Sequence, residues 1–573
     1  MEVKTYPEYS LNYPLLLTTF MKRPVNLYPD RIGVVYRNPE TKTYSRFTWG
    51  QWYERTCRLA NVLRSLGAVP GRPDQPGERV ATMALNHHRH LELYYAVSCS
   101  GAVLHPINIR LSLEHIIHTI NHAQDKILFF DDELLPMVEG IYDRIKDTVK
   151  TFVYLSDTSG QPNTRIADLM VYEDLLSGQL PEFDWPLLHE DTYATLCYTT
   201  GTTGLPKGVM FSHRALYLQS LHKLARDYLN NDPALVKLGE SEVVLLNTPL
   251  YHIHGWGYPY QYLFSANKLV FPGKFTAEGF CDLVQTEKVT LSNLVPTSLT
   301  MLIEYPNLKK YDLSSLKNIG VGGAALPLGL KTKAEELIPG FTATSAYGMT
   351  ETAPSLVGAF IKLNLADRPK EELDRVRVKT GIPLPGIEVE VVDDQGRTVP
   401  RDDATIGHIA IRGPWVMKEY FKDPEKTAAV WRDGWFYTGD VAKVDTEGYL
   451  TIADRVSDMI RSGAEMVPTV LLENLAASAE FILEATFVGV HDDKWGQRPM
   501  AIVTLVAGSE KTEADILDYL EREGVEKGKI ARWMLPDYIL ITNDIPKTSV
   551  GKFNKLYIKE NMPSYLARAK KIR

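Results

Sequence analysis

Apolar residues change spacing repeatedly along the first third of the chain, and the changes predict an α/β fold. Between Trp49 and Leu66 they recur every three or four positions and stop at Gly67, as in an amphipathic helix that ends at a glycine. The run Glu78–Leu85 is mostly apolar, which is typical of a buried strand. Further short strands are predicted between helical segments, at residues 104–108, 126–130 and 151–155. Strands that alternate with helices favour a largely parallel sheet.

The pattern differs in the last two hundred residues. Residues 380–455 predict a β-rich region, because 387–392 alternate apolar and polar positions and a second strand follows at 407–413. The final hundred residues return to strands mixed with helix, with strands predicted at 485–490 and 500–505 and a helix near 513–522.

Length, charge and cysteine usage narrow the class of protein. At 573 residues the chain is long enough for several globular units of about 150 residues each. A net charge of −8 argues against a protein that binds nucleic acids or anionic membranes in general. The four cysteines show no CxxC spacing, which favours a reducing compartment without a zinc site. With no apolar run of about 18 residues and no secretory leader, a cytoplasmic protein without an integral membrane segment is expected.

One stretch, Tyr198–Gly208, has the composition of a phosphate-binding loop. Its glycines allow the backbone to wrap closely around an anion, and its threonine hydroxyls add neutral donors. Lys207 supplies positive charge, but the order Pro-Lys-Gly excludes a Walker A loop, which needs Ser or Thr after the lysine. A flexible surface turn is the alternative. The candidate ligands in this loop are Thr199, Thr200, Gly201, Thr202, Thr203, Gly204 and Lys207.

This loop resembles that of the adenylate-forming synthetases, a superfamily of acyl-CoA synthetases, nonribosomal-peptide adenylation domains and beetle luciferase. Further motifs follow in family order over nearly the whole chain, at residues 249–256, 316–327, 344–351, 433–442, 454–467 and 544–553. The resemblance implies a large N-terminal domain, residues 1–455, of parallel-sheet α/β subdomains plus a β-rich subdomain. Residues 456–573 would form a small, mobile α+β domain.

The resemblance assigns the nucleotide site to named residues. Tyr347 would stack on adenine, Thr350 would contact the α-phosphate, and Glu351 would bind Mg²⁺, a hard cation that prefers carboxylate oxygens. Asp440 would accept hydrogen bonds from both ribose hydroxyls, and Arg455 would contact the nucleotide. Taken alone, Glu351 could be a helix N-terminal charge and Asp440 a turn residue. The remaining ATP/AMP-site positions are Gly323, Ala324 and Gly348.

The acyl side of the site is assigned in the same way. Residues 242–252 predict a buried strand that ends in a polar turn at His252, which resembles the family histidine beside the acyl carboxylate. A structural histidine is the alternative. The acyl pocket would comprise His252, Trp256, Gly322 and Gly323. Lys552 matches the family's catalytic lysine, which bridges the carboxylate and the α-phosphate as the acyl-adenylate forms.

Three positions depart from the family pattern. His408 stands where glutamate is usual, and Ser457 occupies the hinge position that usually carries aspartate or lysine. Ala464 replaces a glycine that lines the pantetheine passage in CoA-forming members, so the predicted CoA tunnel is Gly463 and Ala464. Because the extra methyl group would narrow this passage, the sequence supports the adenylation step more strongly than the thioester step.

The histidines of the first domain could also form a metal site, since His115, His118 and His122 share a helix face. No His-Glu-x-x-His motif accompanies them, so surface or packing roles are favoured, as for the group at 87, 88 and 90.

The resemblance implies an AMP-forming acyl-CoA synthetase that uses MgATP, CoA and a short- to medium-chain carboxylic acid. An acyl-AMP ligase that passes its product to a carrier protein is the main alternative. A luciferase-like oxygenase and a non-enzymatic nucleotide sensor rank lower, the latter because Glu351, Asp440 and Lys552 are all present. The oligomeric state and the identity of the acid stay open.

Overall fold

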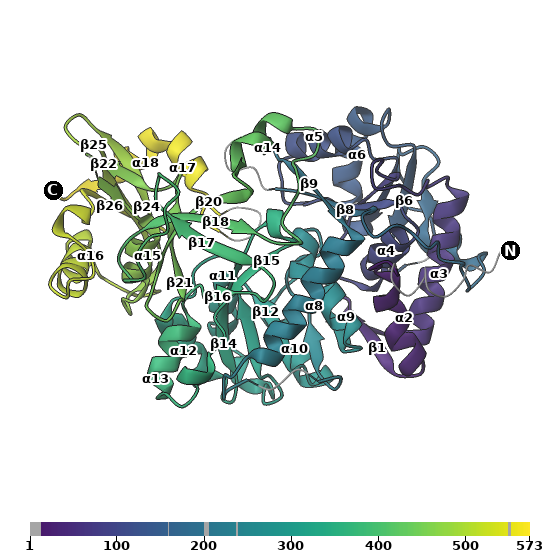
Figure 1. The fold of residues 1–573 in the computed structure, drawn as a ribbon, viewed down its shortest axis with the longest axis horizontal. Helices are drawn as coiled ribbons and strands as arrows, with labels where there is room; N and C mark the ends of the chain where they lie inside the picture. Colours follow the sequence, from purple (N-terminus) through teal and green to yellow (C-terminus); the bar gives the residue numbers. More distant parts are fainter. Residues whose placement is uncertain (1–12, 159, 200–204, 236–238, 464, 548–551) are drawn as a thin grey trace.

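The computed structural model describes residues 13–158, 160–199, 205–235, 239–463, 465–547 and 552–573. Within these ranges the strands form four sheets, of seven, nine, five and six strands (Figure 1). The predicted α/β class is confirmed, including a β-rich region and a small C-terminal α+β unit. No helix in the described part of the chain is long and apolar enough to cross a membrane.

The seven-stranded sheet holds the phosphate loop at one edge. Its order is β7-β6-β5-β3-β4-β8-β9, parallel except for the terminal hairpin β8–β9. The strands are β3 (Arg79–Met83), β4 (Val103–Pro106), β5 (Ile127–Asp131), β6 (Thr151–Leu155), β7 (Met170–Val171), β8 (Tyr193–Tyr198) and β9 (Gly208–Ser212). The helices of this region are α2 (Thr18–Leu27), α3 (Trp49–Ser65), α4 (His88–Cys99), α5 (Leu113–Ala123), α6 (Leu135–Ile145), α7 (Tyr172–Ser177) and α8 (His213–Leu229).

Helix α3 has local features that explain why the spacing of apolar residues predicted it. It begins with a capping box, in which the Thr48 hydroxyl accepts from the Gln51 amide and the Gln51 side chain accepts from the Thr48 amide. Its apolar face buries Trp49 and Trp52 completely. The chain leaves the helix through Gly67, whose φ of +77° is readily adopted by glycine.

The nine-stranded sheet brings two site segments to one edge. Its order is β16-β15-β14-β13-β12-β10-β11-β1-β2, and β12, β13 and β14 are parallel neighbours, so their carboxyl ends lie together. The strands are β1 (Ile32–Arg37), β2 (Tyr44–Thr48), β10 (Val243–Leu245), β11 (Lys268–Phe271), β12 (Leu291–Leu294), β13 (Asn318–Val321), β14 (Thr342–Gly348), β15 (Ser355–Gly358) and β16 (Ile382–Pro383). The helices are α9 (Tyr258–Phe264), α10 (Ala277–Glu287), α11 (Pro296–Ile303), α12 (Leu328–Leu337) and α13 (Lys370–Arg377).

Strand β10 is shorter than the strand predicted within residues 242–252. One more amide, that of Leu246, donates to the Val270 carbonyl of β11 at 2.9 Å. The next two amides turn to a side chain instead, because those of Asn247 and Thr248 both donate to Asn293 Oδ1, at 3.0 and 3.2 Å. The segment that leads to His252 is therefore a buried loop.

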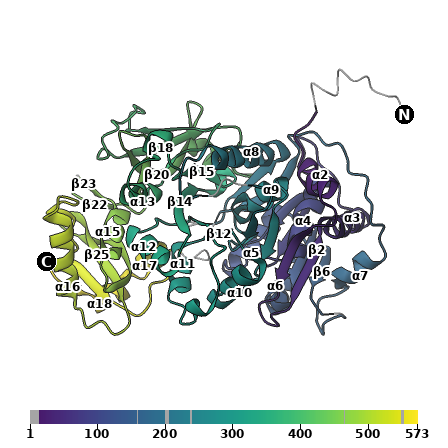
Figure 2. The ribbon, with the colours of Figure 1, turned by 90° about the horizontal axis from the view of Figure 1, so that it is seen from below.

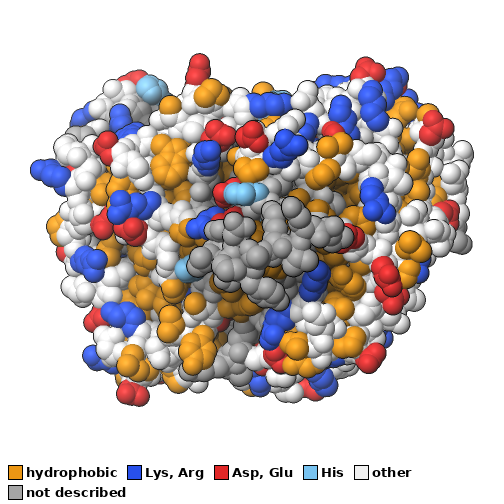
Figure 3. Space-filling model, turned by 45° about the vertical axis from the view of Figure 1, so that its right-hand side comes forward, with side chains coloured by type: hydrophobic (Ala, Val, Ile, Leu, Met, Phe, Trp, Pro, Cys, Tyr) orange, Lys and Arg blue, Asp and Glu red, His pale blue; other side chains and the backbone are white. Residues whose placement is uncertain are grey.

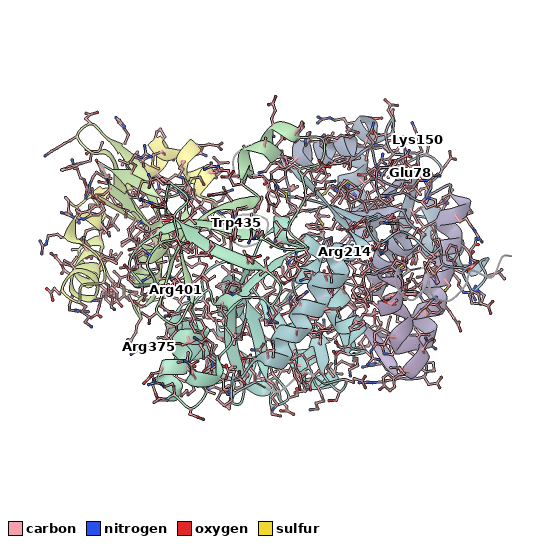
Figure 4. All side chains as sticks on the ribbon, viewed as in Figure 1. Glu78, Lys150, Arg214, Arg375, Arg401 and Trp435 are labelled. Carbon is pink, nitrogen blue, oxygen red and sulfur yellow. The ribbon has the colours of Figure 1, made fainter. Side chains whose placement is uncertain are left out.

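The five-stranded antiparallel sheet forms the β-rich region. It contains β17 (Glu388–Val392), β18 (Gly407–Arg412), β19 (Trp431–Arg432), β20 (Trp435–Val444) and β21 (Leu450–Arg455), with α14 (Pro424–Val430) beside it. Trp435, labelled in Figure 4, begins β20, and the Arg412 guanidinium of β18 lies 4.4 Å from its ring centroid. Asp440 and Arg455 are direct cross-strand partners on β20 and β21.

The six-stranded sheet uses only residues after 459, and it lies at the opposite end of the molecule from the N-terminus (Figures 1 and 2). Its strands are β22 (Ile460–Ser462), β23 (Glu465–Val467), β24 (Ile482–Asp492), β25 (Gly496–Leu505), β26 (Tyr538–Ile541) and β27 (Lys570–Lys571). Its helices are α15 (Thr469–Ala477), α16 (Glu513–Leu520), α17 (Lys555–Glu560) and α18 (Met562–Arg568). The predicted boundary after residue 455 thus falls between strands of different sheets.

Candidate active site

A cleft of about 1240 Å³ brings most of the described candidate nucleotide residues together. It is lined from the nine-stranded sheet by the segments that follow β12 and β13 and by the end of β14, from the five-stranded sheet by β20 and β21, and from the C-terminal unit by α15 and the segment at 552–555. The predicted site residues among its walls are Gly323, Ala324, Tyr347, Gly348, Asp440, Arg455 and Lys552. On the face seen in Figure 3, acidic and basic side chains are interspersed around hydrophobic ones.

The base of the phosphate loop is closed by two hydrogen bonds between its ends. The Thr199 amide donates to the Lys207 carbonyl at 2.9 Å, and the Lys207 amide donates to Thr199 Oγ1 at 3.1 Å. The predicted ligands Thr200, Gly201, Thr202, Thr203 and Gly204 lie outside the described residues.

Tyr420 links the phosphate-loop lysine to the predicted magnesium ligand. Its hydroxyl donates to Glu351 Oε1 at 2.8 Å and accepts from Lys207 Nζ at 3.0 Å. The ammonium also lies 4.1 Å from the tyrosine ring centroid. Because a neutral hydroxyl stands between the two charges, Lys207 and Glu351 are both held in place by the same group. No sequence motif indicated Tyr420, which is brought beside the loop by the bond from the Phe421 amide to the Gly208 carbonyl, at 2.8 Å.

The Tyr420→Phe variant tests this link. We expect kcat/KM for MgATP to fall about tenfold, since a hydrogen bond to a charged group contributes roughly 1.5–3 kcal/mol. Steady-state rates at varied Mg²⁺ should show a higher half-saturating concentration. Tyr437→Phe, on the five-stranded sheet, is the matched control. An unchanged Mg²⁺ dependence in Tyr420→Phe would contradict the role.

The residues predicted to bind the ribose form a pair of opposite charges beside a tyrosine. Asp440 is buried, its Oδ2 accepts from the Tyr347 hydroxyl at 2.5 Å, and its Oδ1 lies 3.2 Å from Arg455 Nε. Both carboxylate oxygens of Asp440 therefore face side chains, those of Tyr347 and Arg455, that the resemblance predicts to bind the nucleotide. Asp440 also lies on the cleft wall, as a ribose contact requires.

Lys552 reaches into the centre of this arrangement. A Cβ added at Gly323 would lie 3.6 Å from Lys552 Cε, so the lysine stem passes directly over the glycine. Loss of solvation and the Arg455 guanidinium lower the pKa of Lys552 to about 8, with Asp440 acting in the opposite direction. Loss of solvation and the Lys552 ammonium lower the pKa of His252 to about 3, so its imidazole is neutral at pH 7.

The pKa of Lys552 predicts an alkaline limit on adenylation. If the charged amine is the active form, kcat/KM for pyrophosphate–ATP exchange should fall as pH rises through about 8, because kcat/KM reports the free enzyme. Thioester formation from supplied acyl-AMP, which does not need this charge, should not fall over the same range. A parallel decline of both half-reactions would assign the limit to another group.

Trp256 packs against Gly322 and Gly323, two glycines of the predicted acyl pocket. A Cβ at Gly322 would lie 3.0 Å from Trp256 Cη2, so the ring packs where a side chain would otherwise stand. The ring is carried by an unusual turn, because every residue from Ile253 to Gly257 has positive φ, between 31° and 74°. Such a conformation costs about 1–2 kcal/mol for each L-residue. Lys223 is buried on α8, and its Nζ donates to the Trp256 carbonyl at 2.7 Å, which helps to hold the turn.

Several other candidates have local explanations. Gly348 is required by packing, since a Cβ there would lie 1.6 Å from the Pro354 carbonyl oxygen. Thr350 begins the short 3₁₀ turn that carries Glu351. Gly463 lies at the β22–β23 hairpin, where its amide donates to the Trp495 carbonyl at 2.6 Å; Ala464 is outside the described residues. His408 bonds Asp394 at 3.0 Å on the surface of the β-rich region.

The histidines considered as metal ligands have protein partners. His87 Nε2 lies 2.8 Å from Asp131, and His90 Nε2 lies 3.0 Å from the Thr82 hydroxyl. On α5, His118 stacks on His122, whose Nδ1 lies 2.7 Å from the Tyr198 hydroxyl. Within the described ranges, no group of three or more His, Cys, Asp or Glu side chains could hold a metal ion.

Family models match both parts of the chain. The AMP-binding enzyme model matches residues 21–421, and the AMP-binding enzyme C-terminal domain model matches residues 471–552. The chain belongs to the AMP-binding enzyme family. It is 37% identical over 569 residues to a long-chain-fatty-acid–CoA ligase of Thermus thermophilus, with 99% of each chain covered. It is 34% identical to a medium-chain-fatty-acid–CoA ligase of Ectopseudomonas oleovorans, with 92% of each chain covered.

Solved structures of this family share the fold. ATP-bound MatB from Rhodopseudomonas palustris has a TM-score of 0.78 at 27% identity, over 95% of this chain and 98% of that one. The anthranilate CoA ligase AuaEII, solved with anthranoyl-AMP, has a TM-score of 0.82 at 22% identity, over 97% and 98% of the two chains, and supports the fold alone. The resemblance found in the sequence is confirmed: this AMP-binding enzyme is an AMP-forming acyl-CoA synthetase of the adenylate-forming superfamily.

Proposed function

We propose that this enzyme activates a short- to medium-chain carboxylic acid with MgATP and transfers the acyl group to CoA. The observation that carries the proposal is the position of Lys552, whose stem lies over Gly323 beside both Trp256 and the Asp440–Arg455 pair. One cation thus stands between the predicted acyl pocket and the predicted nucleotide site. Residues 1–455 would form the adenylate-forming domain and 456–573 the mobile lid, in a cytoplasmic protein.

The first half-reaction joins the acid to AMP. A carboxylate oxygen attacks the α-phosphorus of ATP, the bond to the β-phosphate oxygen breaks, and pyrophosphate leaves with the electron pair. The Lys552 ammonium would stabilise charge on the carboxylate and α-phosphate, and Lys207 charge on the departing phosphates. The single carboxylate Glu351 suits Mg²⁺, which commonly binds one or two carboxylates plus substrate phosphates and would there neutralise phosphate charge. Neutral His252 would donate a hydrogen bond to the acid.

In the second half-reaction the CoA sulfur attacks the acyl carbon and AMP leaves with the former carboxylate oxygen. The thiol proton is released, so the products are a thioester and AMP. This step needs a different group facing the adenylate, which a rotation of residues 456–573 about Ser457 would supply. The proposed passage for the CoA arm is lined by Gly463 and Ala464.

The acid-length preference follows from Trp256, whose indole packs against Gly322 and would shorten the acyl pocket. We expect Trp256→Ala to move the acid with the highest kcat/KM to a longer chain. Each additional buried methylene contributes about 0.8 kcal/mol, or roughly fourfold in kcat/KM. A series of straight-chain acids from four to twelve carbons tests this prediction. An unchanged optimum would remove Trp256 from the pocket wall.

Transfer to a carrier protein is the second candidate function, and Ala464 at the proposed CoA passage is the observation that favours it. Loss of free CoA thiol measured alongside AMP release separates the two. If the amount of AMP released equals the amount of CoA thiol lost, the CoA ligase is supported. If pyrophosphate forms without loss of thiol, a carrier-dependent ligase is supported.

A further inference from the structure

A cluster of polar side chains crosses the predicted hinge. It consists of Asp454 at the end of β21, Thr469 and Glu473 on α15, and Lys555 at the start of α17. Thr469 is fully enclosed, Asp454 is 2% exposed and Lys555 is 9% exposed. Buried polar groups in native proteins almost always have hydrogen-bond partners.

The hydrogen bonds of the cluster join a strand of the five-stranded sheet to two helices of the C-terminal unit. Asp454 Oδ2 accepts from the Thr469 amide at 2.6 Å and from the Thr469 hydroxyl at 2.7 Å. The same hydroxyl accepts from Lys555 Nζ, which also pairs with Glu473 Oε1 at 2.8 Å. Since Thr469 is the first residue of α15, the carboxylate satisfies an amide that has no partner within the helix.

The cluster joins the two parts that are expected to move. Asp454 belongs to β21 of the five-stranded sheet, and α15 packs directly against that strand (Figure 1). Thr469 and Lys555 follow the hinge position Ser457. A rotation about that position must therefore separate Asp454 from Thr469.

The cluster is also close in sequence to two candidate active-site residues, Arg455 and Lys552. Side chains alternate along a strand, so Asp454 faces α15 while its neighbour Arg455 faces Asp440. Lys555 lies three residues after Lys552, at the start of the helix that follows it. The position of α15 against β21 thus fixes the segment from which Lys552 reaches Gly323.

We propose that Asp454 is a latch for the adenylation orientation: its bonds to Thr469, supported by Lys555, hold the C-terminal unit where Lys552 reaches the acyl and nucleotide sites. Asp454 is a positioning residue, and it acts through the placement of Lys552. The proposal rests on the two half-reactions of the proposed function, and it states that the latch must open before the thioester step.

Two variants weaken the latch with little change in shape. Asp454→Asn removes the charge, and Thr469→Val removes the hydroxyl but keeps the amide. Pyrophosphate–ATP exchange and thioester formation from supplied acyl-AMP are measured separately for each, with melting temperatures as the check on folding. The control is Asp445→Asn, the same change in the turn between β20 and β21, where the carboxylate pairs with Lys379 at 2.5 Å.

We expect each latch variant to lower adenylation about tenfold, the effect of losing a charge-assisted hydrogen bond, while thioester formation holds or rises. The control should leave the ratio of the two rates unchanged. Equal losses in both half-reactions, or no change in either, would overturn the latch. If Asp454→Asn does not fold, Thr469→Val decides the question. A wild-type enzyme without exchange activity would instead overturn the proposed function.

Discussion

Replacement of Lys552 by alanine should abolish adenylation and spare the thioester step. The ammonium stands over Gly323 between the predicted acyl and nucleotide sites, so its removal takes away charge where negative charge develops. A loss of about a thousandfold in acid-dependent pyrophosphate–ATP exchange is expected, at the upper end of effects for one electrostatic contact. The rate of thioester formation from synthetic acyl-AMP and CoA should stay near that of the unaltered enzyme.

A matched substitution separates the site from the general charge of the C-terminal unit. Lys570→Ala removes an exposed lysine on β27 of the same six-stranded sheet and should leave both half-reactions unchanged. If Lys552→Ala lowered both half-reactions equally, Lys552 would act on the fold or on nucleotide binding and not on the first chemical step.

Replacement of Glu351 by glutamine should produce the second largest effect. Glu351 is buried beside Tyr420 and, through it, Lys207, and it is the predicted protein ligand for Mg²⁺. Loss of the carboxylate charge should lower the rate of adenylation about a hundredfold at fixed Mg²⁺. Rates are measured over a wide range of Mg²⁺ at constant ATP.

The form of the Mg²⁺ dependence distinguishes metal binding from packing. Partial recovery of Glu351→Gln at high Mg²⁺ fits a weakened metal site, whereas a lower plateau with the same half-saturating concentration fits a structural role. Glu371→Gln, an exposed glutamate on α13, supplies the control and should behave as the unaltered enzyme.

The sequence predicted the features that depend on neighbouring residues. Helix α3 carries its own capping box and apolar face, so its limits were predicted to within one residue. The short strands β5 and β6 were also placed to within one residue, because continuous apolar runs between helices allow few other structures.

The features that the sequence did not reveal depend on contacts between distant segments. Tyr420 meets Lys207 and Glu351 only when three separate segments fold together, and Asp454 on β21 meets Thr469 at the start of α15. The left-handed turn at 253–257 is equally hidden, since three of its five residues are not glycine. Local propensity argues against such a conformation, and it persists only with outside support such as the Lys223–Trp256 bond.

A carboxylate of the acid should attack the α-phosphorus of ATP in this cleft before CoA takes the acyl group. The most direct measurement uses an acid labelled with ¹⁸O in both carboxylate oxygens, with mass spectrometry of the nucleotide and phosphate products. We expect one ¹⁸O atom in each AMP, together with equal amounts of thioester and of unlabelled pyrophosphate. Label in inorganic phosphate, or thioester formed with unlabelled AMP, would contradict this mechanism.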